Sequence, residues 1–313
     1  MQKKKINGVQ PFNDFFFKSC YYHQLLAGIA CFDVDRDNIL LNYFGVVEGG
    51  FKLRKQDLYE ENELSRLSGF SCKKSNLNKR KLINNINQNK VIIVGVDCFY
   101  LESRKDMYQK EHDSHFVLVY GYDLEKRTVN IVDHDYRNSF SYVEKIVSMD
   151  NLLYANEEYK TNLTSKKTTC FILSKRRKRS EFSIYDKLNL DLLKSNYRKA
   201  TDNLLTFKIM VLSDLESLKE SLDDMAQYYQ DMQNHYFAIS RTKAFSEESR
   251  QFCVSSLVNG YSNLLSLCWK LRASQDFSYL ERKKDSIFRK IDSMLRQEKE
   301  MLDIFSEVCH ERV

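Results

Sequence analysis

Hydrophobic and polar positions change their spacing near residue 175, and the two parts of the chain predict different structures. Before that point, short runs rich in valine and isoleucine alternate with turn residues, which is typical of strands and short helices. Residues 90–100 predict a buried strand, residues 168–173 a further strand, and residues 55–66 a helix. Apolar residues at helical spacing after Cys20 predict a helix that begins at this cysteine.

Residues 115–135 predict a β-hairpin, because two alternating strands flank a turn centred near residues 124–125. In such a hairpin the numbers of paired residues sum to roughly 248 to 250. His115 therefore lies opposite Asp133 or Asp135. Side chains alternate between the two faces along a strand, and this alternation places both carboxylates on the same face of the sheet as His115.

After residue 175 the chain is typical of a helical bundle. Glycine and proline are absent from residues 122–259, and long apolar stripes predict about four helices. Serines followed by acidic residues mark the predicted helix starts, at Ser213, Ser246 and Ser274.

The sequence therefore predicts two domains. The first, residues 1–175, is an α+β domain with an antiparallel sheet, and the second, residues 176–313, is an all-α bundle. The apolar stripes of the second domain predict a bundle core, and the same helices offer a surface for a homodimer.

The charge balance limits the partners only loosely. Forty-nine basic and 43 acidic residues give a net charge of +6, which suits nucleic acid, anionic lipid or an acidic protein. Five consecutive cations, Lys175–Arg179, form either a solvated connector between the domains or a docking patch for an acidic partner. Nucleic acid is disfavoured, because these cations form one block without interleaved aromatic residues.

Cysteine spacing and hydropathy indicate the compartment. Eight cysteines are scattered without any C-x-x-C pair, which excludes a zinc ribbon or a thioredoxin-type motif. The N-terminal residues lack an apolar signal region, and no apolar run of about 18 residues occurs. We therefore expect a soluble cytoplasmic protein without a membrane span, whose cysteines stay reduced.

One cysteine, Cys20, lies where a nucleophile is favoured. A catalytic thiol needs its thiolate form, a base that holds the proton and a third group that orients the base. Unpaired N–H groups at the start of a helix favour a negative sulfur, and Cys20 begins the predicted helix, whereas Cys31 lies at its other end. His115 at a strand end is the predicted base, oriented by Asp133, with Asp135 as the alternative.

Four segments in this order resemble the N-terminal domain of the butirosin biosynthesis protein H family. They are CYYHQ (20–24), VDCFYL (96–101), HDSHFVLVYGYD (112–123) and VNIVD (129–133). The resemblance covers roughly residues 8–175. It implies a papain-like fold related to bacteriocin-processing cysteine peptidases. Members are acyltransferases or amide-forming enzymes that pass an acyl group from a carrier-protein thioester to an amine.

The resemblance also implies a role for each matched residue. Cys20 would be the nucleophile, His115 the general base and acid, and Asp133 the orienting group. His23 and His112 are not needed by the pattern and are predicted to make local hydrogen bonds.

The oxyanion donor departs from the papain-like pattern. Papain-like enzymes place a glutamine six residues before the cysteine, whereas this chain has Asp14 there, which cannot donate when ionised. Asn13 is the predicted donor, with Gln10 and the backbone N–H of Cys20 as alternatives.

The sequence thus predicts a cysteine-dependent acyltransferase of antibiotic or peptide natural-product biosynthesis that needs no metal or organic cofactor. Its predicted partners are an acyl carrier protein bearing a phosphopantetheine thioester and an amine acceptor. Asp97 and Tyr100 follow the buried strand and are predicted to bind the amine; the alternative for Asp97 is to cap a turn. Two other functions remain open: a peptidase, amidase or thioester hydrolase with the same residues, and a non-catalytic scaffold.

Overall fold

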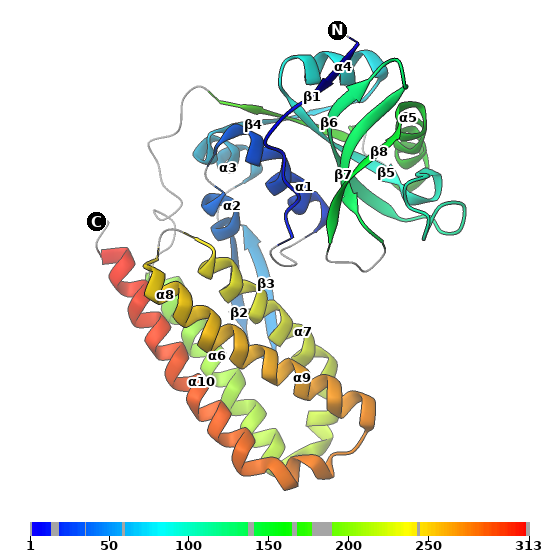
Figure 1. The fold of residues 1–313 in the computed structure, drawn as a ribbon. Coiled ribbons are helices and arrows are strands. Elements are labelled where there is room, and N and C mark those ends of the chain that lie inside the picture. The colour runs from blue at the N-terminus through cyan, green and yellow to red at the C-terminus, as the bar shows by residue number, and fades with distance from the viewer. Residues whose placement is uncertain are drawn as a thin grey trace. The chain divides into compact units, whose positions relative to one another are not determined.

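The computed structural model describes residues 2–13, 19–34, 36–57, 60–136, 141–164, 168–176, 190–242 and 245–310. By its internal contacts the chain divides into two units, which we describe separately (Figure 1). Unit 1 comprises residues 1–39 and 61–181, and unit 2 comprises residues 40–60 and 182–313. Residues 40–60, which the sequence placed in the first domain, therefore group with the helical unit.

Unit 1 is built on one antiparallel sheet, to which the described residues contribute seven strands. The strand order is β4 (Phe70–Ser75), β9 (Cys170–Lys175), β5 (Val91–Asp97), β6 (Ser114–Asp123), β7 (Thr128–His134) and β8 (Tyr142–Ser148), and β1 (Lys3–Lys5) pairs with β6. Strand β5 is buried along its whole length, as its apolar sequence predicts. The predicted α+β class with an antiparallel sheet is confirmed.

The predicted hairpin is formed by β6 and β7. The turn occupies residues 124–127, and the register shifts by one residue between Val119 and Gly121. On the side of the site Leu118 pairs with Val132, which agrees with the predicted register. This register brings the start of β6, which carries His115, beside the end of β7, which carries Asp133.

The helices of unit 1 are α1 (Cys20–Ile29), α3 (Glu61–Ser68), α4 (Lys79–Asn87) and α5 (Met149–Glu158), with single turns at Ala30–Phe32, Cys98–Tyr100 and Tyr159–Leu163. The short helix α2 (Asp37–Asn42) spans the division between the units.

Helix α1 begins at Cys20, as predicted, with Ser19 in extended backbone as its N-cap residue. The helix packs against β6, β5 and β9. It approaches the sheet closely at Gly28, where an added Cβ would lie 3.1 Å from one side chain on each of these three strands. The missing side chain lets α1 lie against the sheet, so Cys20 is held beside the start of β6.

Unit 2 includes a short β-hairpin, β2 (Tyr43–Glu48) paired with β3 (Lys52–Asp57). The predicted helix over residues 55–66 is therefore wrong at its start, and α3 begins only at Glu61. The reason is the turn between the strands, in which Gly50 has a φ of +70° that favours glycine and brings residues 52–57 back onto β2.

The helical part of unit 2 agrees with the predicted bundle of about four helices. It consists of α6 (Leu190–Ser213), α7 (Leu215–Ser240), α8 (Glu247–Phe252) continued through a π-helical turn (Cys253–Val258) into α9 (Asn259–Ser274), and α10 (Ser278–His310). Ser246 caps α8 as predicted. Asp214 and not Ser213 caps α7, and α10 starts at Ser278 rather than at Ser274.

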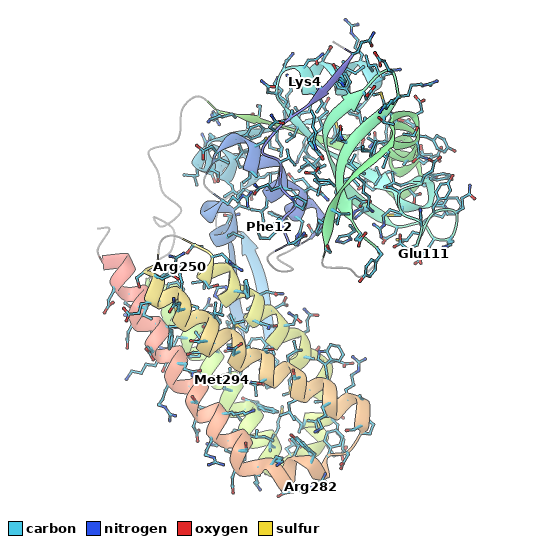
Figure 2. All side chains as sticks on the ribbon, viewed as in Figure 1. Lys4, Phe12, Glu111, Arg250, Arg282 and Met294 are labelled. Carbon is cyan, nitrogen blue, oxygen red and sulfur yellow. The ribbon has the colours of Figure 1, made fainter. Side chains whose placement is uncertain are left out.

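Glu298 is the more deeply buried of two acids, with Asp231, that the described core of unit 2 contains. It lies on α10 one helical turn after Met294, which is labelled in Figure 2, and is 2% exposed. The hydroxyls of Tyr236 and Tyr261 donate to its two carboxyl oxygens, each at 2.5 Å. Burial, which outweighs these two hydrogen bonds, raises the pKa of Glu298 from 4.5 to about 7.

Because the pKa of Glu298 is raised, we expect its contribution to the stability of the protein to fall as the pH rises from about 5 to 8. The unfolded chain releases the proton of Glu298 near its ordinary pKa, whereas the folded chain keeps it up to about 7, so the free energy of unfolding falls across this window. Urea titrations at pH 5 and pH 8 measure the free energy of unfolding. Between these pH values we expect it to decrease by about 2 kcal/mol more in the wild type than in Glu298→Gln, whose side chain is neutral at both pH values. Equal decreases in the two proteins would contradict the assignment.

Two further observations concern the rest of the chain. None of the helices in the described ranges is long and apolar enough to cross a membrane. Of the cation block at Lys175–Arg179, residues 177–179 lie outside the described residues, so its predicted roles stay predictions.

Candidate active site

The thiol of Cys20 and the imidazole of His115 meet where the start of α1 lies against the start of β6. The two side chains are hydrogen-bonded to each other, and the backbones of Phe116 and Tyr21 also bond the sulfur. Cys20 is partly buried, and His115 is 5% exposed. The sulfur is therefore surrounded by groups that stabilise a negative charge.

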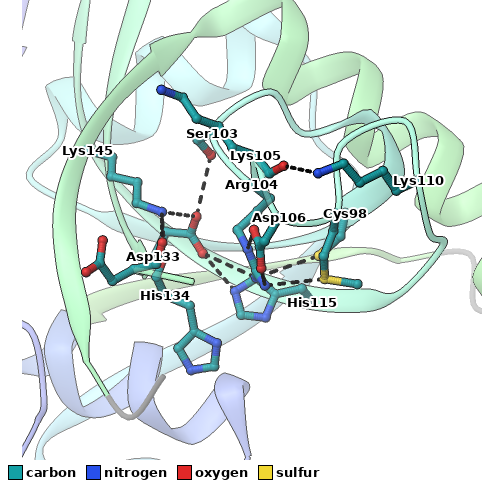
Figure 3. Close-up of polar contacts among 12 residues, drawn as sticks. Cys98, Ser103, Arg104, Lys105, Asp106, Lys110, His115, Asp133, His134 and Lys145 are labelled. Carbon is teal, nitrogen blue, oxygen red and sulfur yellow. Dashed lines mark hydrogen bonds and ion pairs between the residues drawn. The ribbon is translucent and has the colours of Figure 1, made fainter. Parts of the chain in front are cut away.

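The carboxylate of Asp133 bonds the imidazole of His115 (Figure 3). His115 Nε2 is 2.9 Å from Asp133 Oδ1, and Asp133 is fully buried. Because Nε2 is engaged by the carboxylate, Nδ1 is the ring nitrogen left for the thiol. Asp135 is not part of this chain of bonds; its backbone N–H donates to the carbonyl of Ser141. The structure thus brings together the three residues that the sequence singled out.

The pKa values of the three groups shift in the directions of an ion pair. Burial raises the pKa of the Cys20 thiol, but the hydrogen bond and the charge of His115, together with the hydrogen bonds from the backbones of Phe116 and Tyr21, outweigh burial, so the net shift is downward. Burial lowers the pKa of His115, but Asp133 and Cys20 outweigh it and bring the pKa to about 9. The pKa of Asp133 falls to about 2, since His115 and nearby cations outweigh its burial. The shifts of Cys20 and His115 both favour a thiolate facing an imidazolium.

The other cysteines whose side chains the structure describes have no comparable surroundings; they are Cys31, Cys72, Cys98, Cys170, Cys253 and Cys268. Burial raises the pKa of each of these thiols to about 11 or 12. Cys31, at the far end of the same helical stretch, donates to the carbonyl of Gly28 instead of facing an imidazole. Among the described cysteines, Cys20 alone has a lowered pKa.

Asp133 is held by cations that the sequence analysis missed. Lys145 Nζ lies 3.1 Å from Asp133 Oδ2, and Arg104 Nη1 lies 4.0 Å from Oδ1 (Figure 3). Ser103 Oγ also donates to Oδ2, at 3.5 Å. Lys145 belongs to β8, a strand that was not predicted; the β-branched residues of YVEKIVS were the signal that could have found it. These contacts keep the carboxylate ionised and in place.

Three aromatic rings continue the site beyond His115. His134 stacks on His115 with ring centroids 5.1 Å apart, and Tyr142 lies 4.1 Å from His134 on its other side. Tyr142 in turn stacks on His23 at 4.7 Å. Burial lowers the pKa of His134 to about 4, so this ring is neutral at neutral pH.

Asn13, the predicted oxyanion donor, is used elsewhere. Its Nδ2 donates to the carbonyl oxygen of Tyr142 at 2.9 Å, and its Oδ1 accepts from the Tyr142 backbone N–H at 2.7 Å. The described hydrogen bonds of Asn13 therefore hold the start of β8 and do not reach the thiol. Asp14, at the position that papain-like enzymes reserve for glutamine, lies outside the described residues.

Asp97 and Tyr100, the predicted amine-binding residues, form a cluster of their own. Asp97 accepts from the backbone N–H of Phe99 at 3.0 Å and lies 2.7 Å from His112 Nδ1. Tyr100 packs edge-on against Phe99 and His112. Val96 pairs with His115, so alternation turns Asp97 to the opposite face of the sheet. The described contacts do not connect this cluster with Cys20, and an amine-binding role stays a prediction.

His23 and His112, which the predicted catalytic residues do not include, make local contacts, as expected from the sequence. His23 Nδ1 lies 3.2 Å from the carbonyl oxygen of Phe12, which is labelled in Figure 2, and His112 pairs with Asp97. A cavity of about 400 Å³ lies elsewhere, in unit 2 between α9 and α10, and its lining includes Lys270, Lys283 and Lys290. It contains no thiol or imidazole, so we place the chemistry at Cys20.

Comparison with known protein families supports the resemblance drawn from the sequence. Residues 66–134 match a family model described as butirosin biosynthesis protein H, N-terminal. The matched segment contains His115 and Asp133 but does not extend to Cys20, so the geometry alone connects the thiol with the matched residues. No curated protein matches the chain.

Proposed function

We propose that this chain is a papain-like, cysteine-dependent acyltransferase that acts in the biosynthesis of an antibiotic or a related natural product. The carrying observation is the arrangement of three side chains: the Cys20 thiol is hydrogen-bonded to His115, and His115 Nε2 lies 2.9 Å from Asp133 Oδ1. The family match supports the biosynthetic setting, since the matching family is named for butirosin biosynthesis. A cysteine that opens a helix lying on an antiparallel sheet, with histidine and aspartate on adjacent strands, supports the papain-like assignment.

The first half of the proposed reaction loads the enzyme. The Cys20 thiolate attacks the carbonyl carbon of a thioester, a new C–S bond forms, and the carbonyl π electrons move onto oxygen. The tetrahedral intermediate collapses when the C–S bond to the donor breaks, and the departing thiolate takes the proton that His115 carries. Asp133 holds the imidazole in the orientation that delivers this proton.

The second half transfers the acyl group. A neutral amine attacks the acyl carbon on Cys20, and His115 accepts a proton from the amine nitrogen. The C–S bond breaks, the product leaves as an amide, and the thiolate–imidazolium pair is restored. The sum is a thioester plus an amine going to an amide plus a thiol, without an oxidant, a metal or a nucleotide.

A carrier protein is the acyl donor that we propose. Its phosphopantetheine arm presents a thioester, and carrier proteins are acidic, which suits the net charge of +6 of this chain. The arm is long and thin, so it can deliver the thioester to a thiol that is partly buried.

Acyl transfer from a loaded carrier protein tests the proposal. The chain is mixed with an acyl-phosphopantetheinyl carrier protein, and intact mass spectrometry follows the mass of the chain before and after a panel of primary amines is added. We expect one acyl group on Cys20, located by peptide mapping, and release of an amide with some of the amines. Release of free acid alone, whichever amine is supplied, would assign the hydrolase function instead. Absence of acylation at Cys20 with every donor would contradict an enzymatic role.

A further inference from the structure

Near the thiol, one buried hydroxyl has no hydrogen-bond partner in the described part of the chain: Tyr142 Oη. Tyr142 is the first residue of β8, pairs with His134 on β7 and is 1% exposed. A buried hydroxyl without a partner lowers stability by about 1–3 kcal/mol, so its retention beside a reactive group points to use by a ligand or a reaction intermediate.

The ring that carries this hydroxyl is held on several sides. His23 stacks against it with an interplanar angle of 13°, and His134 lies against it at 4.1 Å. Asn13 bonds both the N–H and the carbonyl of Tyr142, which fixes the backbone of this residue. The hydroxyl is therefore pre-positioned, as catalysis by a hydrogen-bond donor requires.

Ring contacts connect Tyr142 with the site: its ring lies 4.1 Å from that of His134, which stacks on His115 at 5.1 Å. The oxyanion is the former carbonyl oxygen, which is attached to the carbon that bonds the sulfur. A donor to this oxygen must therefore lie farther from the sulfur than a direct hydrogen-bond partner of the thiol. Tyr142 is close enough to Cys20 and Asp133 to interact with their charges, yet its hydroxyl makes no hydrogen bond to either of them. Burial and these negative charges raise the pKa of Tyr142, which keeps the proton available for donation.

We propose that Tyr142 Oη donates a hydrogen bond to the substrate carbonyl oxygen as Cys20 attacks, and so supplies the oxyanion stabilisation that the position of Asp14 lacks. The C–S bond forms, the π electrons move onto oxygen, and the Tyr142 proton is shared with that oxygen but is not transferred. When the donor thiol leaves, the carbonyl is restored and the hydrogen bond weakens. This inference rests on the proposed acyl transfer, and it assigns Asn13 the role of holding the donor.

Gln24 is the competing donor. It lies one helical turn after Cys20 on α1, it is fully buried, and neither of its amide atoms has a hydrogen-bond partner among the described residues. Its side chain is therefore unpartnered like that of Tyr142, and a variant at each position distinguishes the two.

The experiment compares Tyr142→Phe, Gln24→Met and the matched control Tyr229→Phe, which removes an equally buried, unpartnered hydroxyl from unit 2. An acyl-N-acetylcysteamine thioester is the donor, and two rates are measured: acylation of Cys20 and its alkylation by iodoacetamide. We expect Tyr142→Phe to slow acylation by about 10²- to 10³-fold and to change alkylation less than about threefold, because alkylation passes through no oxyanion. The control Tyr229→Phe should be acylated and alkylated at the wild-type rates.

Three results would overturn the assignment of Tyr142: unchanged acylation in Tyr142→Phe, a parallel loss of acylation and alkylation, or a loss of acylation in Gln24→Met alone. Failure of the proposed function would give a different result in the wild type. In that case the wild type itself is alkylated but never acylated at Cys20, whatever donor is supplied.

Discussion

Replacing Cys20 with alanine is expected to abolish acyl-enzyme formation and to lower amide formation by about 10⁴-fold or more. The reason is that the other described thiols have pKa values raised to about 11 or 12 by burial, so none of them can replace the thiolate at neutral pH. The measurement is the intact mass of the chain after exposure to a loaded carrier protein, together with the rate of amide formation.

The matched control for this prediction is Cys31→Ala. Cys31 lies eleven residues later, just after α1, and its thiol donates to the carbonyl of Gly28. This variant should form the acyl-enzyme at the wild-type rate. If Cys20→Ala still accumulated an acyl group, or if the control lost activity equally, the nucleophile would lie elsewhere.

The second large effect is expected for Asp133→Asn, which should lower the free energy of unfolding by about 3–5 kcal/mol. Asp133 accepts from His115 through Oδ1 and from Lys145 through Oδ2, and an amide has only one acceptor oxygen. The buried guanidinium of Arg104 loses one of its two carboxylate partners and keeps the other, Asp106, at 3.1 Å. Urea titration at pH 7 measures the loss of stability.

A second substitution tests whether lost charge pairing is the cause. Lys145→Met in the Asp133→Asn background removes one of the cations left without a counter-charge, so it should restore part of the lost stability. The same double variant should not recover acyl transfer, because His115 still lacks its carboxylate. Additive losses of stability in the double variant would show that Lys145 and Asp133 do not act together.

The sequence predicted those parts of the site that depend on the pattern of residues within one helix or one hairpin. Cys20 begins α1 because a run of helical periodicity starts there, and this periodicity is readable in the chain. His115 and Asp133 meet because they lie on the two paired strands of one hairpin, which the sequence predicted. The register shift between Val119 and Gly121 was not predicted.

The parts that the sequence missed depend on pairings between segments of the chain. Asn13 reaches Tyr142 across 129 positions of the chain, which no local period encodes. Lys145 is only 12 positions from Asp133, and it was missed because β8, the strand that carries it, was not predicted. The hairpin of residues 43–57 was missed for a related reason. Its second strand, KLRKQD, is as polar as an exposed helix, and only its pairing across the Gly50 turn makes it a strand.

The most direct test of the central claim is the pH dependence of Cys20 alkylation by iodoacetamide in the wild type and in His115→Asn. If the thiol and the imidazole form an ion pair, the wild-type rate at pH 6 should stay within a few-fold of its rate at pH 8. The variant should instead slow by about 10²-fold over the same interval, as expected for a thiol of ordinary pKa. Parallel profiles in the two proteins, both falling tenfold per pH unit, would mean that His115 does not activate Cys20.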